Sequence, residues 1–589
     1  MMNNNSQRQP GFFSFNGING ATGGYLLAGM SADDLTSIAR GERPDRNHLF
    51  DLELRLRQGS TTTRRIKEGY SPQDLSQAGW GVIFAFQDQD KLPGIKEALR
   101  EVLELRKSQA GERYREFSGP DAYRPGESKA DFLERHGSGP GPADPEKIPY
   151  YLLIVGDPES IPYTFQYQLD VQYAVGRLYF DEQEDYAQYA RSLVQMETGP
   201  TKLARKLALF GVKHPGDQPT EMSASQLVAP LAERLVAEDQ ASGWAIQSVV
   251  GEAATKAKLA SLITGEEAPA LLFSASHGMG FPQDDPRQLP HQGALLCADW
   301  PGPEAWQGPI PAEHYLASED IPSDTGTLGK MGFFFACYGA GTPRLDDFTY
   351  QSIQAPTTLA GEPFIARLPQ RLLGHPKGGM LAVIGHVERS WGYSFYWQRA
   401  GSQLAVFEST LQRLMAGEPV GYAMEYFNER YAELSTELTA ELLGMQIGKQ
   451  VDPLELAGAW TANNDARSYV VLGDPAARLA LQAPVVTAGG AAALESISLE
   501  ASSTKEHTPT SGQAGLEVAE RELIMASMHL GDLYQSRAAG SQQSNLQRAL
   551  YHYRECLELA VQLGDEHTIR SIRQRIDQVM AQIDLDQAG

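Results

Sequence analysis

The chain has 589 residues, with 50 basic and 74 acidic side chains and a formal net charge of −24 at pH 7. An acidic surface repels phosphate backbones, so this charge argues against nucleic-acid binding. Hydrophobic residues make up 42% and charged residues 21%, as in a globular protein of about four ordinary domains or fewer large ones. Three cysteines, Cys297, Cys337 and Cys556, are too few for a disulfide framework and fit a reducing compartment. The polar start of the chain and the lack of an apolar run of about 18 residues predict a cytoplasmic protein with no signal peptide and no membrane span.

The N-terminal region, residues 1–144, has no clear pattern before about residue 79. The Gly- and aromatic-rich stretch 12–27 predicts irregular structure or a hairpin, and its glycines lack the strand-then-helix context of a phosphate loop. From residue 79, a buried strand at 80–86 and a helix at 94–108 predict a strand–helix unit.

Strands and helices alternate in the next region, residues 145–481. An extended stretch is expected to run through residues 171–175. The other predicted strands are 150–155, 206–212, 244–250, 269–275, 331–336, 379–384 and 469–472, and the predicted helices are 185–197, 222–238, 253–264, 369–373 and several within 402–445. The runs 269–275, 331–336 and 379–384 are apolar on both faces, which is typical of central strands in a parallel sheet. The pattern predicts an α/β domain whose mostly parallel sheet is covered by helices on both faces.

The composition changes after residue 481. Residues 482–515 are rich in Ala, Gly, Ser and Thr and predict a flexible linker. Residues 516–589 have a helical pattern, with the packing residues of a tetratricopeptide-like helix pair at Leu530, Gly531, Tyr534, Ala549, Tyr553 and Ala560. Such arrays usually need three repeats, so two interpretations stay open: an appendage that docks or dimerises, or a module that binds a regulatory protein through 516–585.

Two of the central apolar strands end in reactive side chains. The first continues into Ser276, His277 and Gly278, and the second into Cys337. Ligands bind beyond the carboxyl ends of parallel strands, so we expect His277 and Cys337 to face each other across one cleft. A thiol is a strong nucleophile, and a nearby imidazole helps to ionise it or to protonate a leaving amine.

The small residues at these strand ends predict an oxyanion site. Gly278 lets the backbone approach a substrate, and its N–H together with the N–H of Cys337 is the expected pair of oxyanion donors. Taken singly, each reactive residue has an ordinary explanation, a buried structural thiol for Cys337 and a core histidine for His277. Their matching strand-end positions make the pair more specific than either residue alone.

A strand ending in Ser-x-His-Gly, followed about 60 residues later by a strand ending in Ala-Cys-Tyr-Gly, resembles the caspase–gingipain–separase group of cysteine peptidases. CHAT-type and gingipain-like bacterial members are the most similar. The segments 155–162 (VGDPESIP), 169–177 (LDVQYAVGR) and 385–392 (GHVERSWG) extend this resemblance over roughly residues 145–480. It implies a caspase-like fold, a general base at His277 and a nucleophile at Cys337.

The resemblance also implies a specificity pocket for a basic residue. Asp170 resembles the pocket acid of arginine-specific gingipains, and Trp391 resembles their aromatic wall, so cleavage after Arg, with Lys second, is expected. A turn-forming strand-end residue is the alternative for Asp170. Members of the group often act in bacterial signalling, stress or defence against phage.

The remaining motifs support no cofactor and no metal. His291, His375 and His386 lack partners at metal-ligand spacing, and the chain has no C-x-x-C, no Walker loop and no G-x-S-x-G elbow. Two functions from different classes follow. The first is a regulated cysteine endopeptidase acting on protein substrates, with 281–329 as an activation loop or lid. The second is a catalytically silent scaffold that binds partners through its C-terminal helices.

Overall fold

The computed structural model describes residues 12–13, 17–25, 30–31, 66–238, 243–306, 308–346, 358–397, 401–446, 451–484, 570, 572–576 and 579–580. The chain divides into two compact units, Met1–Val486 and Thr487–Gly589. The expected linker from residue 485 onward, Cys556 and most of the expected helical segment 516–589 lie outside the described residues.

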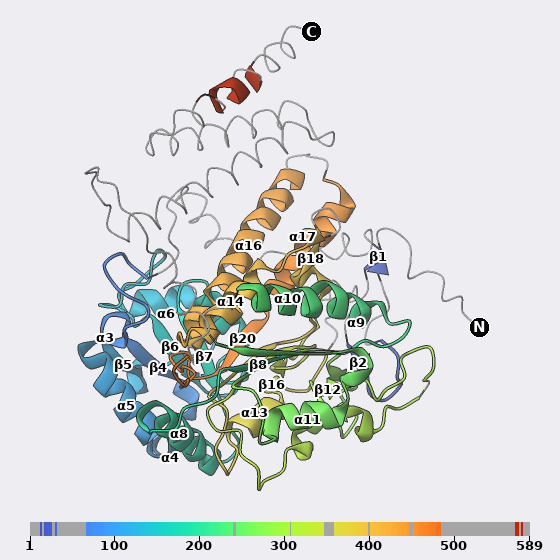
Figure 1. Ribbon diagram of the computed structural model, residues 1–589. Helices are drawn as coiled ribbons and strands as arrows, with labels where there is room; N and C mark the ends of the chain where they lie inside the picture. Colours follow the sequence, from blue (N-terminus) through green and yellow to red (C-terminus); the bar gives the residue numbers. More distant parts are fainter. Residues whose placement is uncertain are drawn as a thin grey trace, which may run out of the picture. The chain divides into compact units, whose positions relative to one another are not determined.

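The first unit is built around a ten-stranded sheet (Figure 1). In spatial order its strands are β5 (Tyr114–Phe117), β4 (Trp80–Phe84), β6 (Tyr151–Val155), β7 (Ala174–Leu178), β20 (Tyr469–Gly473), β17 (Ala382–His386), β14 (Met331–Phe335), β10 (Leu271–Ala275), β8 (Lys206–Gly211) and β9 (Ala245–Val250). The first unit runs across residue 145, where the sequence suggests a boundary, because β4 and β5 join the same sheet as β6.

Neighbouring strands of this sheet run parallel at every pairing except that of β17 with β20. The sheet therefore consists of two parallel blocks that point in opposite directions. The first block is β5, β4, β6, β7 and β20, and the second is β17, β14, β10, β8 and β9. The carboxyl ends of the second block lie at the same edge as the amino ends of the first. The predicted mostly parallel α/β fold is confirmed.

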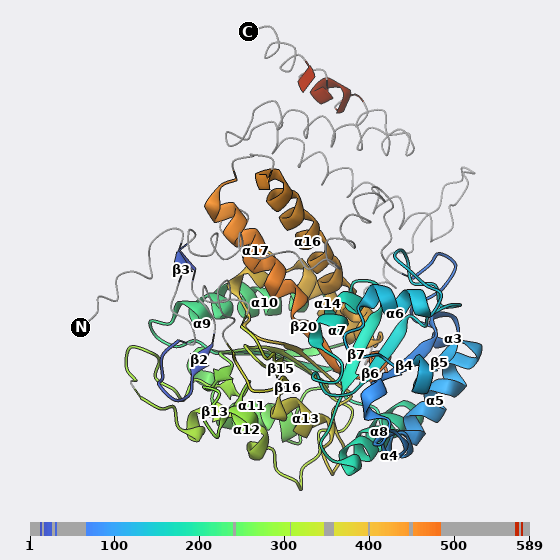
Figure 2. The same cartoon turned by 180° about the vertical axis from the view of Figure 1, so that it is seen from behind.

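Helices cover both faces of the sheet (Figures 1 and 2). Helices α10 and α14 lie over one face of the second block, and α11 and α13 lie over the other, while α16 and α17 project from the sheet as a pair. The helices are α3 (Leu75–Ala78), α4 (Leu92–Ala98), α5 (Arg100–Ala110), α6 (Lys129–Arg135), α7 (Tyr163–Asp170), α8 (Gln183–Thr198), α9 (Gln218–Ser223), α10 (Ala229–Glu238), α11 (Lys256–Thr264), α12 (Gln288–His291), α13 (Arg367–Leu373), α14 (Ala405–Met415), α15 (Val420–Ala423), α16 (Glu425–Gln446) and α17 (Pro453–Arg467). Of the described helices, none combines the length and the apolar character needed to cross a bilayer.

The three strands with two apolar faces, β10, β14 and β17, are fully buried, as their sequences predict. Aromatic packing joins them to the helices above. The ring of Phe273 on β10 lies 5.1 Å from that of Phe333 on β14, and both contact Phe407 of α14. This core holds the strand ends of the second block in a fixed register.

The stretch preceding β7 differs from the sequence expectation. The end of the expected extended stretch 171–175 falls in β7, but the sequence analysis expects no helix before it, and the structure has α7, which begins after Pro162 and ends at Asp170. Aromatic residues favour strands, but here helical spacing brings Tyr163 and Tyr167 into a stacked pair and buries Phe165 and Leu169. Tertiary packing therefore overrides the local β propensity.

Short strands outside the sheet tie distant segments together. The pairs are β1 (Phe12–Phe13) with β3 (Met30–Ser31), β2 (Ile18–Asn19) with β11 (Met279–Gly280), β12 (Leu295–Leu296) with β13 (Tyr315–Leu316), β15 (Gly341–Thr342) with β16 (Phe364–Ile365), and β18 (Tyr396–Trp397) with β19 (Gly401–Ser402). The segment 281–329, expected to be a loop or lid, contains β12 and β13 and packs around its own apolar core, which includes Trp300 and Ile310.

Candidate functional site

Four neighbouring strands of the second block end at one edge of the sheet. The register aligns Gly211 of β8 with Ala275 of β10, and Ala275 with Phe335 of β14. His277 and Cys337 each lie two residues beyond this aligned row, so both sequence-predicted residues occupy equivalent places on neighbouring strands. Asp217 follows β8 and Ser390 follows β17 at the same edge.

Gly278 packs directly against the backbone of Cys337. A Cβ atom at residue 278 would lie 1.7 Å from the carbonyl oxygen and 2.7 Å from the amide nitrogen of Cys337. Any side chain there would push the two strand ends apart. The two expected oxyanion donors therefore belong to adjoining pieces of backbone, and glycine is the residue that permits this approach.

The thiol of Cys337 is fully buried and bonded to Ser390. The Ser390 N–H donates to Sγ at 3.3 Å, and the thiol makes a longer contact of 3.9 Å with the Ser390 carbonyl oxygen. Burial raises the pKa of the Cys337 thiol to about 11, although hydrogen bonds from Ser390 and the charge of Arg389 oppose the shift. In this conformation the Cys337 thiol is covered and protonated.

The backbone on either side of this thiol is strained. Within the described part of the chain, the two non-glycine residues with positive φ are Tyr338, at 58°, and Glu388, at 73°. They are bonded to each other, because the Tyr338 N–H donates to the Glu388 carbonyl oxygen at 2.6 Å. Such left-handed residues persist only where the surrounding structure enforces them, and they cluster at functional sites.

The imidazole of His277 is also fully buried, and both ring nitrogens are bonded. The backbone N–H of Gly17 donates to Nδ1 at 2.7 Å. Nε2 lies 2.8 Å from Oδ2 of Asp217. Since Nδ1 accepts a hydrogen bond, we assign the ring proton to Nε2, which donates to the carboxylate.

Asp217 is a candidate site residue that the sequence analysis missed. It caps the N-terminus of α9, accepts hydrogen bonds from Thr220, and accepts a further one from the hydroxyl of Tyr25. Burial disfavours its charge, but His277 and these hydrogen bonds outweigh burial and hold the pKa of the carboxyl well below its usual range. Asp217 lies six residues beyond the end of β8, too far for the strand-end pattern that identifies His277 and Cys337 to find it.

A second histidine supports the pair. His214 is stacked nearly parallel to His277, with ring centroids 6.3 Å apart, and it packs edge-on against Trp300. Burial and the neighbouring His277 lower the pKa of His214 to about 4. His214 is therefore neutral at physiological pH and adds no charge beside His277.

The segment after β17 covers the thiol and is anchored by a buried ion pair. Arg389 makes two hydrogen bonds of 2.7 Å to the carboxylate of Asp346, and both side chains are almost completely buried. Trp391 follows on the same segment, donates its backbone N–H to the carboxylate of Asp465, and packs against Trp460 of α17. Trp391 thus lies in an apolar cluster formed with α16 and α17.

Asp170 lies at the same edge of the sheet but farther along it. It ends α7 just before β7, and two strands, β20 and β17, separate β7 from β14. Its Oδ2 is buried without a hydrogen-bond partner, in a cavity of about 10 Å³ that Glu425 and Glu429 of α16 also line. Burial raises the pKa of Asp170 well above its usual value, although Arg177 opposes the shift.

The other candidate side chains have structural partners. His291 bonds to Tyr315 and Glu319, His375 to the carbonyl of Pro322, and His386 to the carbonyl of Asp465. Cys297 is buried and contacts the carbonyl oxygen of Leu295 at 3.3 Å.

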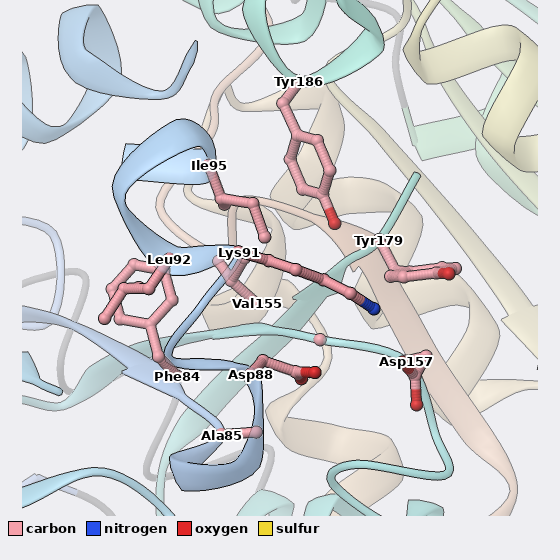
Figure 3. A pocket seen from close by; sticks show the side chains of 11 residues that line it. Phe84, Ala85, Asp88, Lys91, Leu92, Ile95, Val155, Asp157, Tyr179 and Tyr186 are labelled. Carbon is pink, nitrogen blue, oxygen red and sulfur yellow. The ribbon is translucent and has the colours of Figure 1, made fainter. Parts of the chain in front are cut away.

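A small, mostly apolar cavity of about 20 Å³ lies at the opposite edge of the sheet, where β4, β6 and β7 end. Lys91 points into it between Asp88, Asp157 and Tyr179 (Figure 3). The volume has room for one water molecule. Asp157 already accepts backbone hydrogen bonds from Glu159 and Ser160, so its carboxylate closes the turn after β6.

Comparisons with known proteins give little further information. No family model matches the chain, and no curated protein matches it. A solved structure named "Structure of Protease" aligns with 68% of this chain and 78% of its own, at 14% identity and a TM-score of 0.39. At this identity and TM-score, the similarity carries no weight for the fold or the function.

Proposed function

We propose that the chain is a cysteine endopeptidase, with Cys337 as nucleophile and His277 as general base. The observation that carries the proposal is the buried Asp217–His277 pair at the strand end next to the one that bears Cys337. A carboxylate on one ring nitrogen fixes the tautomer and stabilises the imidazolium, so the other nitrogen can exchange a proton with the nucleophile. Asp217 is the positioning residue in this scheme.

The proposed reaction is acyl transfer. Nδ1 of His277 takes the proton of the Cys337 thiol, and the thiolate attacks the peptide carbonyl carbon. The N–H groups of Gly278 and Cys337 stabilise the resulting oxyanion. His277 then returns the proton to the leaving amine, which leaves a thioester that water hydrolyses.

The described conformation corresponds to a resting state in this proposal. The thiol is held by Ser390 and Nδ1 by Gly17, so both reacting atoms must be released before they can meet. A regulated enzyme fits this arrangement. A role in bacterial signalling or defence rests on the family resemblance alone, as does regulation by a protein bound at 516–585.

For the substrate, we propose cleavage after Arg, with Lys second. Asp170 supports this choice because a buried carboxyl oxygen with no partner can accept a cationic side chain, and Glu429 lines the same cavity. A cavity of about 10 Å³ does not hold a guanidinium, so substrate binding must open it.

The test is proteome-wide mapping of new N-termini produced by the parent chain and by Cys337→Ala. Loss of Cys337 should abolish the new termini while leaving thermal melting largely unchanged. Cys297→Ala is the matched control, since it removes another fully buried thiol, whose Sγ contacts the carbonyl oxygen of Leu295. Activity that survives Cys337→Ala, or that is lost in Cys297→Ala alone, contradicts the assignment.

A catalytically silent scaffold is the second candidate. The complete burial of Cys337 and His277 favours it, because neither side chain is accessible as described. The parent chain would then produce no new termini under any condition, and Cys337 would stay unreactive toward a small alkylating reagent.

A further inference from the structure

Residues 17–25, here called the N-terminal strap, lie directly on the proposed base. Strand β2 of the strap pairs in parallel with β11, which begins two residues after His277. The N–H of Ile18 donates to the carbonyl of Gly278 at 3.4 Å, and the N–H of Gly20 donates to the carbonyl of Gly280 at 2.8 Å. The strap therefore binds as an added strand, the mode by which many proteins bind extended peptides.

The strap is also anchored on its other sides. Ile18 is fully buried in the small core that contains Met279 and Trp300. The N–H of Ile310 donates to the carbonyl of Gly20 at 2.9 Å, and the hydroxyl of Tyr25 donates to Asp217. Backbone pairing, an apolar anchor and a contact with the carboxylate of Asp217 hold the strap in one register.

The strap forms a hydrogen bond to Nδ1 of His277, the ring nitrogen that Asp217 does not contact. Nε2 is bonded to Asp217, and Nδ1 accepts the Gly17 N–H, so no ring nitrogen is left to take the proton of Cys337. In acyl transfer, the same nitrogen must donate its proton to the amine that leaves the scissile bond. The amide nitrogen of Gly17 thus lies where a leaving-group nitrogen belongs.

We propose that the strap occupies the leaving-group side of the substrate site and holds the enzyme inactive. This inference rests on the proposed peptidase function. In the active enzyme, the substrate chain beyond the scissile bond replaces the strap and pairs with β11 in the same direction. Its first residue takes the place of Gly17, and its second takes the buried place of Ile18. The site therefore selects extended peptides with a small residue first and an apolar residue second after the cut.

The first experiment displaces the strap with a matched pair of glycine variants. In Gly20→Ala the new Cβ would lie 2.2 Å from the ring of Phe281, which is itself buried, whereas in Gly24→Ala the nearest atom is 3.7 Å away. The readout is the rate of His277 carbethoxylation by diethyl pyrocarbonate, followed by peptide mass spectrometry. It should rise at least about fivefold in Gly20→Ala, the factor expected for losing one net hydrogen bond, and stay at the parent value in Gly24→Ala. Equal rates in all three proteins overturn the inference.

The second experiment asks whether displacement activates the enzyme. Gly20→Ala and Ile18→Asp, which places a charge in the apolar anchor site, should cleave protein substrates faster than the parent. A synthetic peptide of residues 17–25 should inhibit both variants, and the same peptide carrying Asp at position 18 should not. Exposed His277 with no gain in cleavage overturns the inference, as does inhibition by both peptides. Cleavage that is lost in Cys337→Ala confirms the proposed function independently of either outcome.

Discussion

The two blocks of the sheet are built alike but use their strand ends differently. In the first block, Asp157 follows β6 and bonds to the backbone of Glu159 and Ser160, two and three residues away. In the second block, Asp217 follows β8 and bonds to His277, which is 60 residues away. Both carboxylates follow the carboxyl end of a parallel strand, at opposite edges of one sheet.

The difference shows how a strand-end polar group becomes a site. Asp157 satisfies its oxygens locally, and the cavity beside it has space for one water molecule (Figure 3). Asp217 is fully buried, and its partners come from the N-terminal strap, from α9 and from the segment that follows β10. Long-range contacts fix the position and protonation of an ionisable group, which local turn bonds alone do not do.

The largest effect, a loss of cleavage rate, is expected for Asp217→Asn, which changes the strand-end carboxylate of the second block. Asparagine keeps the cap of α9, but its amide favours the wrong tautomer of His277 and removes the charge that stabilises the imidazolium. Cleavage should fall by about 10³–10⁴-fold, by analogy with carboxylate loss in other His-based peptidases. The measurement is the initial rate on a protein substrate, with thermal melting to confirm folding. A loss below about tenfold would show that His277 needs no carboxylate.

The sequence predicts the strands and the placing of His277 and Cys337 at neighbouring strand ends, but not the segments that cover these two residues. The apolar runs that become β10 and β14 stop at His277 and Cys337, so local pattern and the strand-end rule suffice. The sequence pattern does not identify Asp217, because this residue lies six residues beyond β8, in a turn with no apolar run of its own. The contact between Gly17 and His277 spans 260 residues, and no local pattern encodes it. The helix α7 is missed because packing overrides the strand preference of its aromatic residues.

The second prediction concerns Asp170, which lies at the same edge of the sheet as Cys337, and it tests whether Asp170 determines substrate specificity. Cleavage after Arg should fall by about 2–4 kcal/mol of transition-state stabilisation in Asp170→Asn. A guanidinium that binds beside the carboxyl lowers its pKa and pairs with the ionised form, which the amide cannot supply. Folding stability should not fall, since burial raises the pKa of Asp170 and already favours its neutral form. Matched fluorogenic peptides ending in Arg, Lys, Asp and Leu provide the measurement. A parent preference for Asp or Leu, or an unchanged rate on Arg, ends this assignment.

Trp391 is the second expected specificity residue, and for its substitution the same peptide assay must separate a loss of substrate binding from a loss of folded protein. It is almost completely buried against Trp460, so Trp391→Ala removes a core side chain at a cost of about 3–5 kcal/mol of folding stability. The weaker effect on Arg substrates expected of a stacking wall must therefore be measured as kcat/KM per folded molecule.

The third prediction is a pH dependence of stability that arises in the second block. The folded pKa of His214, about 4, lies below its unfolded value of about 6.5, so the unfolded chain binds more protons between these values. The stability from neutral His214 is therefore fully present above about pH 6.5 and is lost as pH falls toward 4, by at most about 3 kcal/mol. Urea unfolding at pH 7, 5.5 and 4 measures the slope, which His214→Gln should flatten. An equal slope in the variant would assign the acid sensitivity to other groups, such as Asp217.

The smallest effect is expected at the first block, with Asp157→Asn. An asparagine oxygen can accept the same hydrogen bonds from Glu159 and Ser160, so the turn after β6 should keep its shape, and folding stability should change by no more than about 1 kcal/mol. Cleavage by the second block should stay at the parent rate, because Asp157 lies at the opposite edge of the sheet from Cys337. The assay is the same initial-rate measurement used for Asp217→Asn, run beside urea unfolding. Asp157→Asn could instead lower the cleavage rate as much as Asp217→Asn does, with unfolding unchanged. That result would mean that the edge bearing Lys91 and Asp88 takes part in the reaction, and the functional contrast between the two blocks would be wrong.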